Sequence, residues 1–182
     1  MEHGLVLSGF GGQGLLFAGQ IVAQAAVLEG RNVSWLPSYG PEMRGGSAAC
    51  TVIVSERPIG SPVLDQAAVV IALNPPAMAK YAGLLAPGGL LVVNDSLIEA
   101  EPGRSDVEIV RIPASALART IGDERFISIV ALGAALGRRP IVSPAAFRQA
   151  LDAVGKGGRA VTEANLEAFA AGSRAAGQPA TA

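Results

Sequence analysis

The sequence predicts one α/β domain, a three-layer α/β/α sandwich built on a mostly parallel, Rossmann-like sheet. The chain has 182 residues, the size of one domain. Short apolar runs, typical of strands covered on both faces, alternate with stretches of helical periodicity. A glycine-rich turn follows the first apolar run. We expect the domain to span residues 1–174 and residues 175–182 to form a disordered tail.

The first third of the chain predicts a strand, a helix and two further strands. Residues 5–7 form an apolar run that ends in glycines, and residues 15–28 carry apolar side chains at helical spacing. Gly30 stands where a glycine commonly ends a helix. A β-prone run then begins at residue 32 and is closed by Pro37, so that a βαβ unit results. Residues 47–55 predict the next strand, with a turn after it.

The middle of the chain predicts a second β-α-β step. Residues 68–73 and 90–93 are continuous apolar runs, which indicates strands that are buried on both faces. Residues 77–85 between them can form a short helix. Residues 107–112 alternate apolar and charged side chains, which predicts a strand near an edge of the sheet.

The last third of the chain is predicted to be helical. Residues 114–121 and 126–136 have helical periodicity, and Gly137 is expected to end the second of these helices. Ser143 should cap a third helix that starts at Pro144, and Thr162 a fourth through Ala171. Because no repeat, charge block or long linker interrupts the pattern, the sequence supports no second domain.

The composition argues against several classes of function. Fourteen Lys and Arg against 15 Asp and Glu give a net charge of −1, and with 4% aromatic residues this disfavours a nucleic-acid binder. One cysteine and one histidine cannot form a Cys/His zinc site or hold a four-thiolate iron–sulfur cluster. Glycines and glutamines break the apolar N-terminal stretch, so we expect neither a signal peptide nor membrane binding, and a cytoplasmic location.

The glycine turn, Gly9-Phe10-Gly11-Gly12-Gln13-Gly14, matches the pattern G-x-G-x-x-G between a strand and a helix. Missing Cβ atoms let the backbone approach a pyrophosphate, whose charge the helix N-terminus stabilises. A nicotinamide cofactor would also need an acidic residue about 20 positions further on, where this chain has Ser-Trp-Leu-Pro at residues 34–37. The turn therefore favours another phosphate-bearing ligand, although its glycines could instead serve only close packing.

The segment at residues 35–46 is the least generic part of the chain. Its sequence, Trp-Leu-Pro-Ser-Tyr-Gly-Pro-Glu-Met-Arg-Gly-Gly, combines prolines that stiffen a loop with glycines that bend it. If it is extended, Glu42 and Arg44 project to the same side. Because the segment follows the second strand, where α/β ligand crevices form, we expect it to line a site or a subunit contact. The alternative is a surface loop with a weak ion pair.

Three segments resemble the gamma subunit, or gamma domain, of the 2-oxoacid:acceptor (ferredoxin) oxidoreductases, including the pyruvate/ketoisovalerate oxidoreductase gamma domain. They are residues 9–14, residues 37–46 (Pro-Ser-Tyr-Gly-Pro-Glu-Met-Arg-Gly-Gly) and residues 58–62 (Pro-Ile-Gly-Ser-Pro), in the family's order and spacing. The resemblance covers about residues 4–172. In one departure, many members carry an asparagine where this chain has Glu124-Arg125-Phe126-Ile127.

Enzymes of this family decarboxylate a 2-oxoacid on thiamine diphosphate, pass electrons through iron–sulfur clusters to ferredoxin and form an acyl-coenzyme A. The resemblance implies that this chain assists assembly and contacts coenzyme A. Thiamine diphosphate, Mg²⁺ and the clusters would belong to partner alpha and beta subunits, or alpha, beta and delta subunits, which would also meet ferredoxin. The Tyr-Gly-Pro-Glu-Met-Arg string is closer to the 2-oxoglutarate and branched-chain types than to pyruvate enzymes, so 2-oxoglutarate is the expected substrate.

These inferences assign the chain no catalytic residue, no metal ligand and no cofactor that it binds alone. The expected ligand contacts are Gly9, Phe10, Gly11, Gly12, Gln13, Gly14, Tyr39, Glu42, Arg44 and Gly45. Cys50 is expected to be a buried small side chain rather than a reactive thiol. The rival functions are a stand-alone NAD(P)-dependent dehydrogenase and a noncatalytic interaction module that binds no nucleotide.

Overall fold

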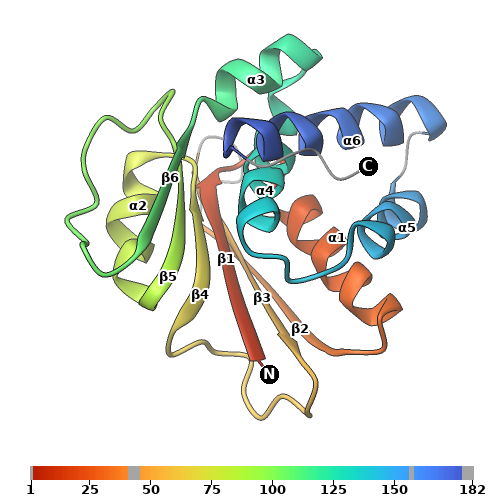
Figure 1. The fold of residues 1–182 in the computed structure, drawn as a ribbon, viewed down its shortest axis with the longest axis horizontal. Coiled ribbons are helices and arrows are strands. Elements are labelled where there is room, and N and C mark those ends of the chain that lie inside the picture. Colours follow the sequence, from red (N-terminus) through yellow and green to blue (C-terminus); the bar gives the residue numbers. More distant parts are fainter. Residues whose placement is uncertain (1, 41–45, 156–157, 178–182) are drawn as a thin grey trace.

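The computed structural model describes residues 2–40, 46–155 and 158–177. These residues form six strands and six α-helices (Figure 1), with one-turn 3₁₀ helices before β5 and α4. In chain order the elements are β1 (Glu2–Phe10), α1 (Leu15–Leu28), β2 (Asn32–Tyr39), β3 (Ser47–Ser55), β4 (Ala67–Ala72), α2 (Pro75–Tyr81), β5 (Leu85–Asn94), β6 (Glu108–Ile112), α3 (Ala114–Ile121), α4 (Ile127–Arg138), α5 (Pro144–Val154) and α6 (Gly158–Ala175).

The strands form one sheet in the order β2-β3-β1-β4-β5-β6. The pairs β1–β4, β4–β5 and β5–β6 are parallel, whereas β3 is antiparallel to both β1 and β2. The predicted single α/β domain with a mostly parallel sheet is therefore confirmed. The strand expected near an edge, β6, is an edge strand.

The predicted βαβ unit of β1, α1 and β2 contains an inserted strand. β1 and β2 run in the same direction because both are antiparallel to β3, which lies between them. In the sheet order β2 is the first strand and pairs only with β3, so it is an edge strand. A proline is tolerated in an edge strand, because its missing N–H removes no hydrogen bond on the unpaired side. This explains why β2 continues past Pro37, opposite Cys50, to Tyr39 instead of ending there.

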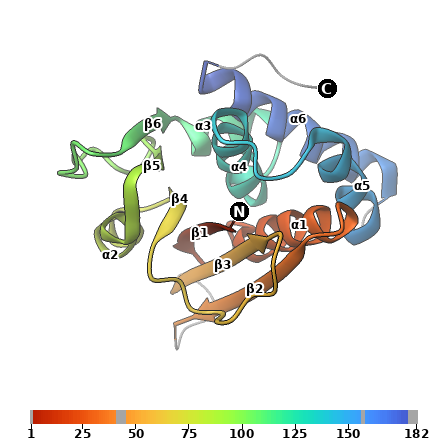
Figure 2. The same ribbon diagram turned by 60° about the horizontal axis from the view of Figure 1, so that its bottom comes forward.

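Side chains alternate between two cores, one on each face of the sheet. Val69, Ile71 and Leu73 join the larger core, which also contains buried residues of α1, α3, α4, α5 and α6. Val70 and Ala72 point the other way, into a smaller core with α2. Figure 2 shows α2 on one side of the sheet and α1, α4, α5 and α6 on the other. The three-layer arrangement explains why the central strands are continuously apolar.

The centre of the sheet contains a topological switch point. The chain leaves β1 for α1 on one face, and leaves the neighbouring parallel strand β4 for α2 on the opposite face. At such a point the two connections diverge, so that a crevice opens outside the carboxyl ends of the strands. The glycine turn after β1 lies at this edge of the sheet (Figure 1).

The helix ends follow part of the local signals. Gly137, expected to end its helix, lies inside α4, which continues to Arg138. Gly30 has a φ of 74° just after α1, as expected of a glycine that ends a helix. The Ser143 hydroxyl accepts a hydrogen bond from the Ala146 N–H at 3.2 Å, which confirms the predicted cap of α5. The prediction that Thr162 caps the last helix is wrong, because α6 already begins at Gly158. An Arg159–Glu163 pair across one helical turn, 3.2 Å apart, accompanies this earlier start.

Helices α4 and α6 approach so closely that their glycines leave no room for a side chain. A Cβ atom on Gly172 would lie 1.7 Å from the Val130 carbonyl oxygen, and one on Gly133 would lie 2.0 Å from the Phe169 carbonyl oxygen. Both contacts are with backbone, which cannot rotate away. Close contact between these two helices therefore requires glycine at both positions.

We expect Gly172→Ala to lower the free energy of unfolding by about 3 kcal/mol, because the helices must separate. Gly83→Ala is the matched control: Gly83 lies in a helical turn with nothing within 4 Å of an added Cβ. The control should stay within about 1 kcal/mol of the wild type. Urea denaturation of the full chain measures both, and equal stabilities of the two variants would contradict the proposed packing constraint.

Candidate functional site

The glycine turn between β1 and α1 is closed by its own glutamine. Gln13 is only 9% exposed, and its Oε1 accepts a hydrogen bond from the Phe10 N–H at 2.7 Å. The Gly11 N–H donates to the Gly46 carbonyl oxygen at 2.9 Å, which ties the turn to the start of β3. The N–H groups of Phe10 and Gly11 are therefore already used within the chain and are not free for a ligand.

In the later part of the turn the Gln13 N–H donates to the Phe10 carbonyl oxygen at 3.4 Å, whereas the N–H groups of Gly12 and Gly14 donate to none of the described residues. Gly12 and Gly14 have φ values of 97° and 79°, which favour glycine. Gly14 is the N-cap of α1, and in the described structure no side chain caps this helix and no acidic residue lies in its first turn. The first N–H groups of an α-helix have no partner within the helix and carry partial positive charge. This end of the turn can therefore bind an anion.

The glycine turn packs against the start of α4. A Cβ atom on Gly14 would lie 2.4 Å from the Arg125 carbonyl oxygen, so the close approach requires glycine. In addition, the Ser128 hydroxyl, which is fully buried, donates a hydrogen bond to the Gln13 carbonyl oxygen. These contacts place the Arg125 backbone against the N-terminus of α1, and Arg125 and Gly14 line the same cleft.

The Arg125 guanidinium is oriented by Asp123. Its Nε and Nη2 donate to Asp123 Oδ2 at 3.0 and 2.7 Å, while Nη1 has no partner among the described residues. Through this hydrogen bond Arg125 lowers the pKa of Asp123, and Asp123 raises the pKa of Arg125. The Arg125 side chain is 78% exposed, so the pair itself adds little stability. The pair leaves the guanidinium with one free donor edge, at Nη1.

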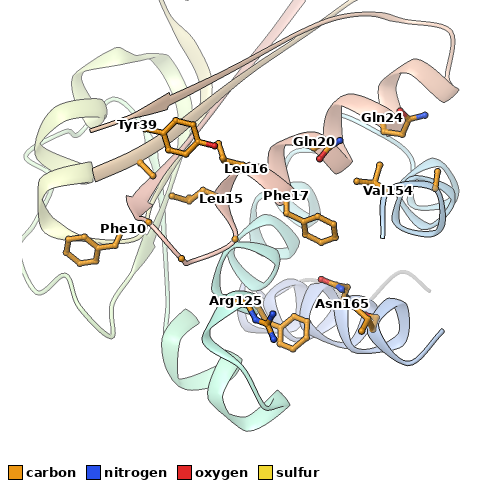
Figure 3. A pocket seen from close by; sticks show the side chains of 17 residues that line it. Phe10, Leu15, Leu16, Phe17, Gln20, Gln24, Tyr39, Arg125, Val154 and Asn165 are labelled. Carbon is orange, nitrogen blue, oxygen red and sulfur yellow. Dashed lines mark hydrogen bonds between the residues drawn. The ribbon is translucent and has the colours of Figure 1, made fainter. Parts of the chain in front are cut away.

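A cleft of about 950 Å³ opens beside the turn, between α1, the start of α4, α5 and α6. Figure 3 shows side chains from all these elements converging on it, with Tyr39 at the end of β2 on its rim. Phe10, Gly11, Gly12, Gly14 and Tyr39 line the cleft. The structure thus brings half of the ten expected contact residues together in one site.

The other five expected residues are placed differently. A Cβ on Gly9 would lie 2.3 Å from Gln13 Oε1 and 2.9 Å from Leu73 Cβ, so Gly9 serves packing. Gln13 closes the turn from inside. Glu42, Arg44 and Gly45 lie outside the described residues. Their roles as ligand contacts stay predictions.

The sequence reasoning missed the polar residues that the helices contribute to the cleft. They are Gln20 and Gln24 of α1, Arg125 before α4, and Asn165 of α6. The one available signal was the Glu124-Arg125 departure from the family's asparagine, because it placed an arginine just ahead of an apolar helix. The other three residues belong to no motif.

A second, smaller hollow of about 380 Å³ lies on the opposite side of the β1 end. Gly9, Asn74, Lys80 and Tyr81 contribute to it, and the Lys80 Nζ lies 5.0 Å from the centre of the Tyr81 ring. Asn74 is committed to capping α2, since its Oδ1 accepts from the Ala77 N–H at 2.8 Å. The Asn74 side-chain oxygen is therefore not free for a ligand.

The described part of the chain contains neither a potential metal site nor a helix that could span a membrane. No three His, Cys, Asp or Glu side chains come together as a potential metal site there. None of the described helices combines the length and apolar character needed to cross a membrane.

Fold and site define a doubly wound α/β domain with a glycine turn and an uncapped helix N-terminus at its switch point. A model of the pyruvate ferredoxin/flavodoxin oxidoreductase family matches residues 4–175. The chain belongs to this family, and the resemblance seen in its three sequence segments is confirmed.

Two relatives differ in how much of their own length this chain covers. It is 38% identical over 168 residues to the ketoisovalerate oxidoreductase subunit VorA of Methanothermobacter thermautotrophicus, covering 91% of this chain and 35% of VorA. It is 35% identical over 176 residues to the 2-oxoglutarate synthase subunit KorC of Methanocaldococcus jannaschii, covering 94% of this chain and 92% of KorC. The chain thus spans about a third of VorA but nearly all of KorC.

Two solved structures have the same fold. The gamma subunit of the keto/oxoacid ferredoxin oxidoreductase from Geobacter sulfurreducens PCA superposes with a TM-score of 0.85 and 32% identity, covering 97% of both chains. The 2-oxoglutarate:ferredoxin oxidoreductase from Magnetococcus marinus, solved with 2-oxoglutarate, coenzyme A and succinyl-CoA bound, superposes with a TM-score of 0.84 and 28% identity. The match covers 97% of this chain and 31% of the Magnetococcus chain.

Cys50 does not line the cleft; it belongs to β3 and its sulfur faces Gly19 of α1. It is fully buried, as predicted, and a Cβ on Gly19 of α1 would lie 2.3 Å from its sulfur. Burial raises the pKa of the Cys50 thiol to about 12, against a small opposing effect of a hydrogen bond from Trp35. The folded chain therefore holds Cys50 as a neutral thiol.

For the turn, we expect Gly14→Ala to destabilise the chain more than Gly12→Ala. Both substitutions cost about 1–2 kcal/mol because they put an L-residue at a positive φ. Gly14→Ala should cost about 1–3 kcal/mol more, because its Cβ meets the Arg125 carbonyl, whereas a Cβ on Gly12 meets nothing within 4 Å. Urea denaturation gives the difference, and equal losses would show that the contact with Arg125 does not constrain the turn.

The raised pKa of Cys50 predicts a loss of stability in alkali. An unfolded thiol ionises above its ordinary pKa of 9.0, whereas the folded thiol stays neutral up to about 12. The stability that this burial contributes is complete below pH 9.0 and falls by up to about 1.4 kcal/mol per pH unit above it. Unfolding free energies from pH 8 to 11 test this, with Cys50→Ala as the control. Parallel curves for the two proteins would refute the prediction.

Proposed function

We propose that the chain acts as the gamma subunit of a thiamine diphosphate-dependent 2-oxoacid:ferredoxin oxidoreductase and that its cleft binds the phosphates of coenzyme A. The observation that carries this proposal is the convergence of two anion-binding groups on one cleft. These are the free N-terminus of α1 and the Arg125 guanidinium. The family and the named relatives supply the enzyme class.

A phosphate-bearing ligand fits this end of the cleft for a chemical reason. Backbone N–H groups at a helix N-terminus donate to phosphate oxygens, and glycines let the ligand approach them. The planar guanidinium of Arg125 matches phosphate oxygens and retains a free edge. The coenzyme A held in the Magnetococcus relative supports this choice of ligand.

The redox chemistry is assigned to partner chains. The 182 residues contain one cysteine, too few for a four-thiolate cluster, and Gly122-Asp123 is followed by Glu124 instead of the glycine of a thiamine motif. Thiamine diphosphate, Mg²⁺ and iron–sulfur clusters would lie in alpha and beta subunits, with or without delta, and these would deliver electrons to ferredoxin. We propose a cytoplasmic complex.

The favoured substrate is 2-oxoglutarate, converted to its acyl-coenzyme A and CO₂. The match to KorC supports this choice because it runs almost from end to end in both chains. The ketoisovalerate relatives keep branched-chain 2-oxoacids as the second candidate. The pocket for the 2-oxoacid would be built by partner subunits.

A stand-alone NAD(P)-dependent dehydrogenase is the less favoured function. β3 separates β2 from β1, so the strand that follows α1 does not lie next to β1 in the sheet as it does in a dinucleotide fold. In addition, none of the described residues that line the cleft is an Asp or Glu able to bind ribose hydroxyls. An interaction module without a nucleotide is the third candidate, with the exposed Phe10 and Tyr39 as its contact residues.

The test is a reconstitution of the complex from this chain and the neighbouring subunits. The complex should reduce a viologen dye with 2-oxoglutarate and coenzyme A, whereas the isolated chain should not. Arg125→Ala in the complex should raise the KM for coenzyme A about tenfold and leave the KM for the 2-oxoacid unchanged, because it removes one charged hydrogen bond.

Arg148→Ala is the matched control, since Arg148 is exposed on α5 and does not line the cleft. It should leave both KM values unchanged. Oxidation of a 2-oxoacid by the isolated chain, or a complex that tightly binds NADH but not coenzyme A, would refute the proposal. Full activity of a complex that omits the chain would refute it as well.

A further inference from the structure

The two edges of the sheet differ in how they are protected. The β6 edge is short, five residues, and carries Glu108 and Arg111. Arg138 donates to the Glu108 carboxylate at 2.7 Å. The Arg111 guanidinium donates to the carbonyl oxygens of Ile98 and Ala100, in the loop that precedes the strand. Short length and charged side chains keep an edge strand from pairing with another strand, so the β6 edge is protected.

The β2 edge lacks this protection. β2 spans eight residues, Asn32–Tyr39, and contains no charged side chain. Figure 2 shows it as the outermost strand on its side of the sheet. Trp35, Leu36 and Tyr39 on this strand are 38%, 45% and 56% exposed. Because a long, uncharged edge with apolar side chains readily pairs with another strand, the β2 edge has the properties of a surface that another strand covers.

The outward backbone groups of β2 follow from its pairing with β3. The Gly40 N–H donates to the Ser47 carbonyl oxygen at 2.8 Å, so these two residues form a hydrogen-bonded pair just beyond the end of β2. In an antiparallel ladder such pairs alternate with pairs whose N–H and C=O groups point to the outer side of the strand. The residues of β2 that point these groups outward are Val33, Trp35, Pro37 and Tyr39.

The proline gives this edge a specific pattern of donors. Pro37 has no N–H, so the outward donors of β2 are those of Val33, Trp35 and Tyr39. All four outward residues still offer a carbonyl oxygen. A strand that pairs with β2 must therefore place acceptors opposite the three donors and needs no acceptor opposite Pro37.

A second copy of β2 matches this pattern in one antiparallel register. When the two strands pair about a two-fold axis at Leu36, Val33 lies opposite Tyr39 of the second copy. Trp35 then lies opposite Pro37 of the second copy, and every outward donor meets a carbonyl oxygen. An axis at Ser34 or Trp35 would leave the Tyr39 donor without a partner in β2. An axis at Pro37 would leave the Val33 donor without one.

The side chains also agree with this register. Trp35 lies against α1, since a Cβ on Gly19 would lie 3.1 Å from its Nε1. The next residue, Leu36, therefore points to the opposite face of the sheet. On the two-fold axis it faces Leu36 of the second copy in a pair that is not hydrogen-bonded, where side chains approach most closely. Pairing thus buries the exposed leucine against its own copy.

On these grounds we propose that β2 is a self-pairing edge, through which two copies of this chain join by antiparallel β2 strands into one continuous sheet. The axis passes through Leu36, and the interface is isologous because both copies use the same strand. A strand of another protein would need the same pattern of acceptors, whereas a second copy has it by symmetry. The inference goes beyond the proposed function and does not depend on it.

Cysteine cross-linking of the full chain tests the register. Facing Cα atoms in an antiparallel pair without hydrogen bonds are about 4.5 Å apart, which is within the range of a disulfide. We therefore expect Leu36→Cys to form a covalent dimer with oxidised glutathione as the oxidant. The native Cys50 is fully buried and should not react.

Two control variants show whether a link depends on position. Ser38→Cys is exposed on the same strand and face, but in the proposed register it lies about 13 Å along the strand from its own copy, too far for a disulfide. Leu97→Cys, in the loop after β5, replaces a leucine that is also 45% exposed. Neither control should form a covalent dimer.

Sedimentation of the full chain measures the association itself. The wild type should form a dimer of twice the chain mass of 18.4 kDa. Leu36→Lys should raise the dimer dissociation constant about tenfold or more, because it sets two positive charges against each other on the axis. Leu97→Lys is the matched control and should leave the constant unchanged.

Three results would overturn the proposal. The first is a wild-type chain that stays monomeric at every concentration measured; if Leu36→Lys then also prevents binding to the neighbouring subunits, the edge belongs to a strand of a partner instead. The second is a dimer that Leu36→Lys weakens no more than Leu97→Lys. The third is cross-linking of Ser38→Cys as fast as that of Leu36→Cys, which would exclude the register.

Discussion

The packing of the glycine turn against the start of α4 is the contact on which the site depends. Gly14 is at once the N-cap of α1 and the residue that touches the Arg125 carbonyl, so one position fixes both the helix N-terminus and the arginine. The hydrogen bond from Ser128 to the Gln13 carbonyl holds the same junction from the buried side. The N-terminus of α1 and Arg125, which are more than a hundred residues apart in sequence, thereby become neighbours.

The sequence predicted the strands and helices better than it predicted which strands lie next to one another in the sheet. Strands buried on both faces leave continuous apolar runs, as in β4 and β5, and the helices of the larger core keep a helical period. The insertion of β3 between β1 and β2 had no such signal, because strand order is set by pairing across the sheet and not by local composition. The early start of α6 was missed for a related reason: its Gly158 and Arg159 look like loop residues, yet the helix packs on α4.

For the site as well, the sequence located a local element but not the contacts that the fold makes to it. The glycine pattern located the turn correctly, but it does not reveal which N–H groups are free. The Gln13 side chain accepts from the Phe10 N–H and the Gly46 carbonyl from the Gly11 N–H, so the free donors are those of Gly12, Gly14 and the first turn of α1. Arg125, Gln20 and Asn165 come from three separate helical segments, and only the folded chain brings them to one cleft.

The charge balance of the cleft explains why such a chain would work as one part of a larger assembly. A ligand with a pyrophosphate and a 3′-phosphate carries about four negative charges. In the described part of the chain the cleft offers one arginine, which already shares its charge with Asp123, and the partial charge of one helix end. The apolar and amide side chains that line the rest of the cleft cannot neutralise such a ligand. The remaining cations have to come from beyond the described residues of this cleft, and a partner subunit that covers the exposed Phe10–Tyr39 rim can supply them. Binding and assembly would then be coupled, because the ligand holds the two surfaces together.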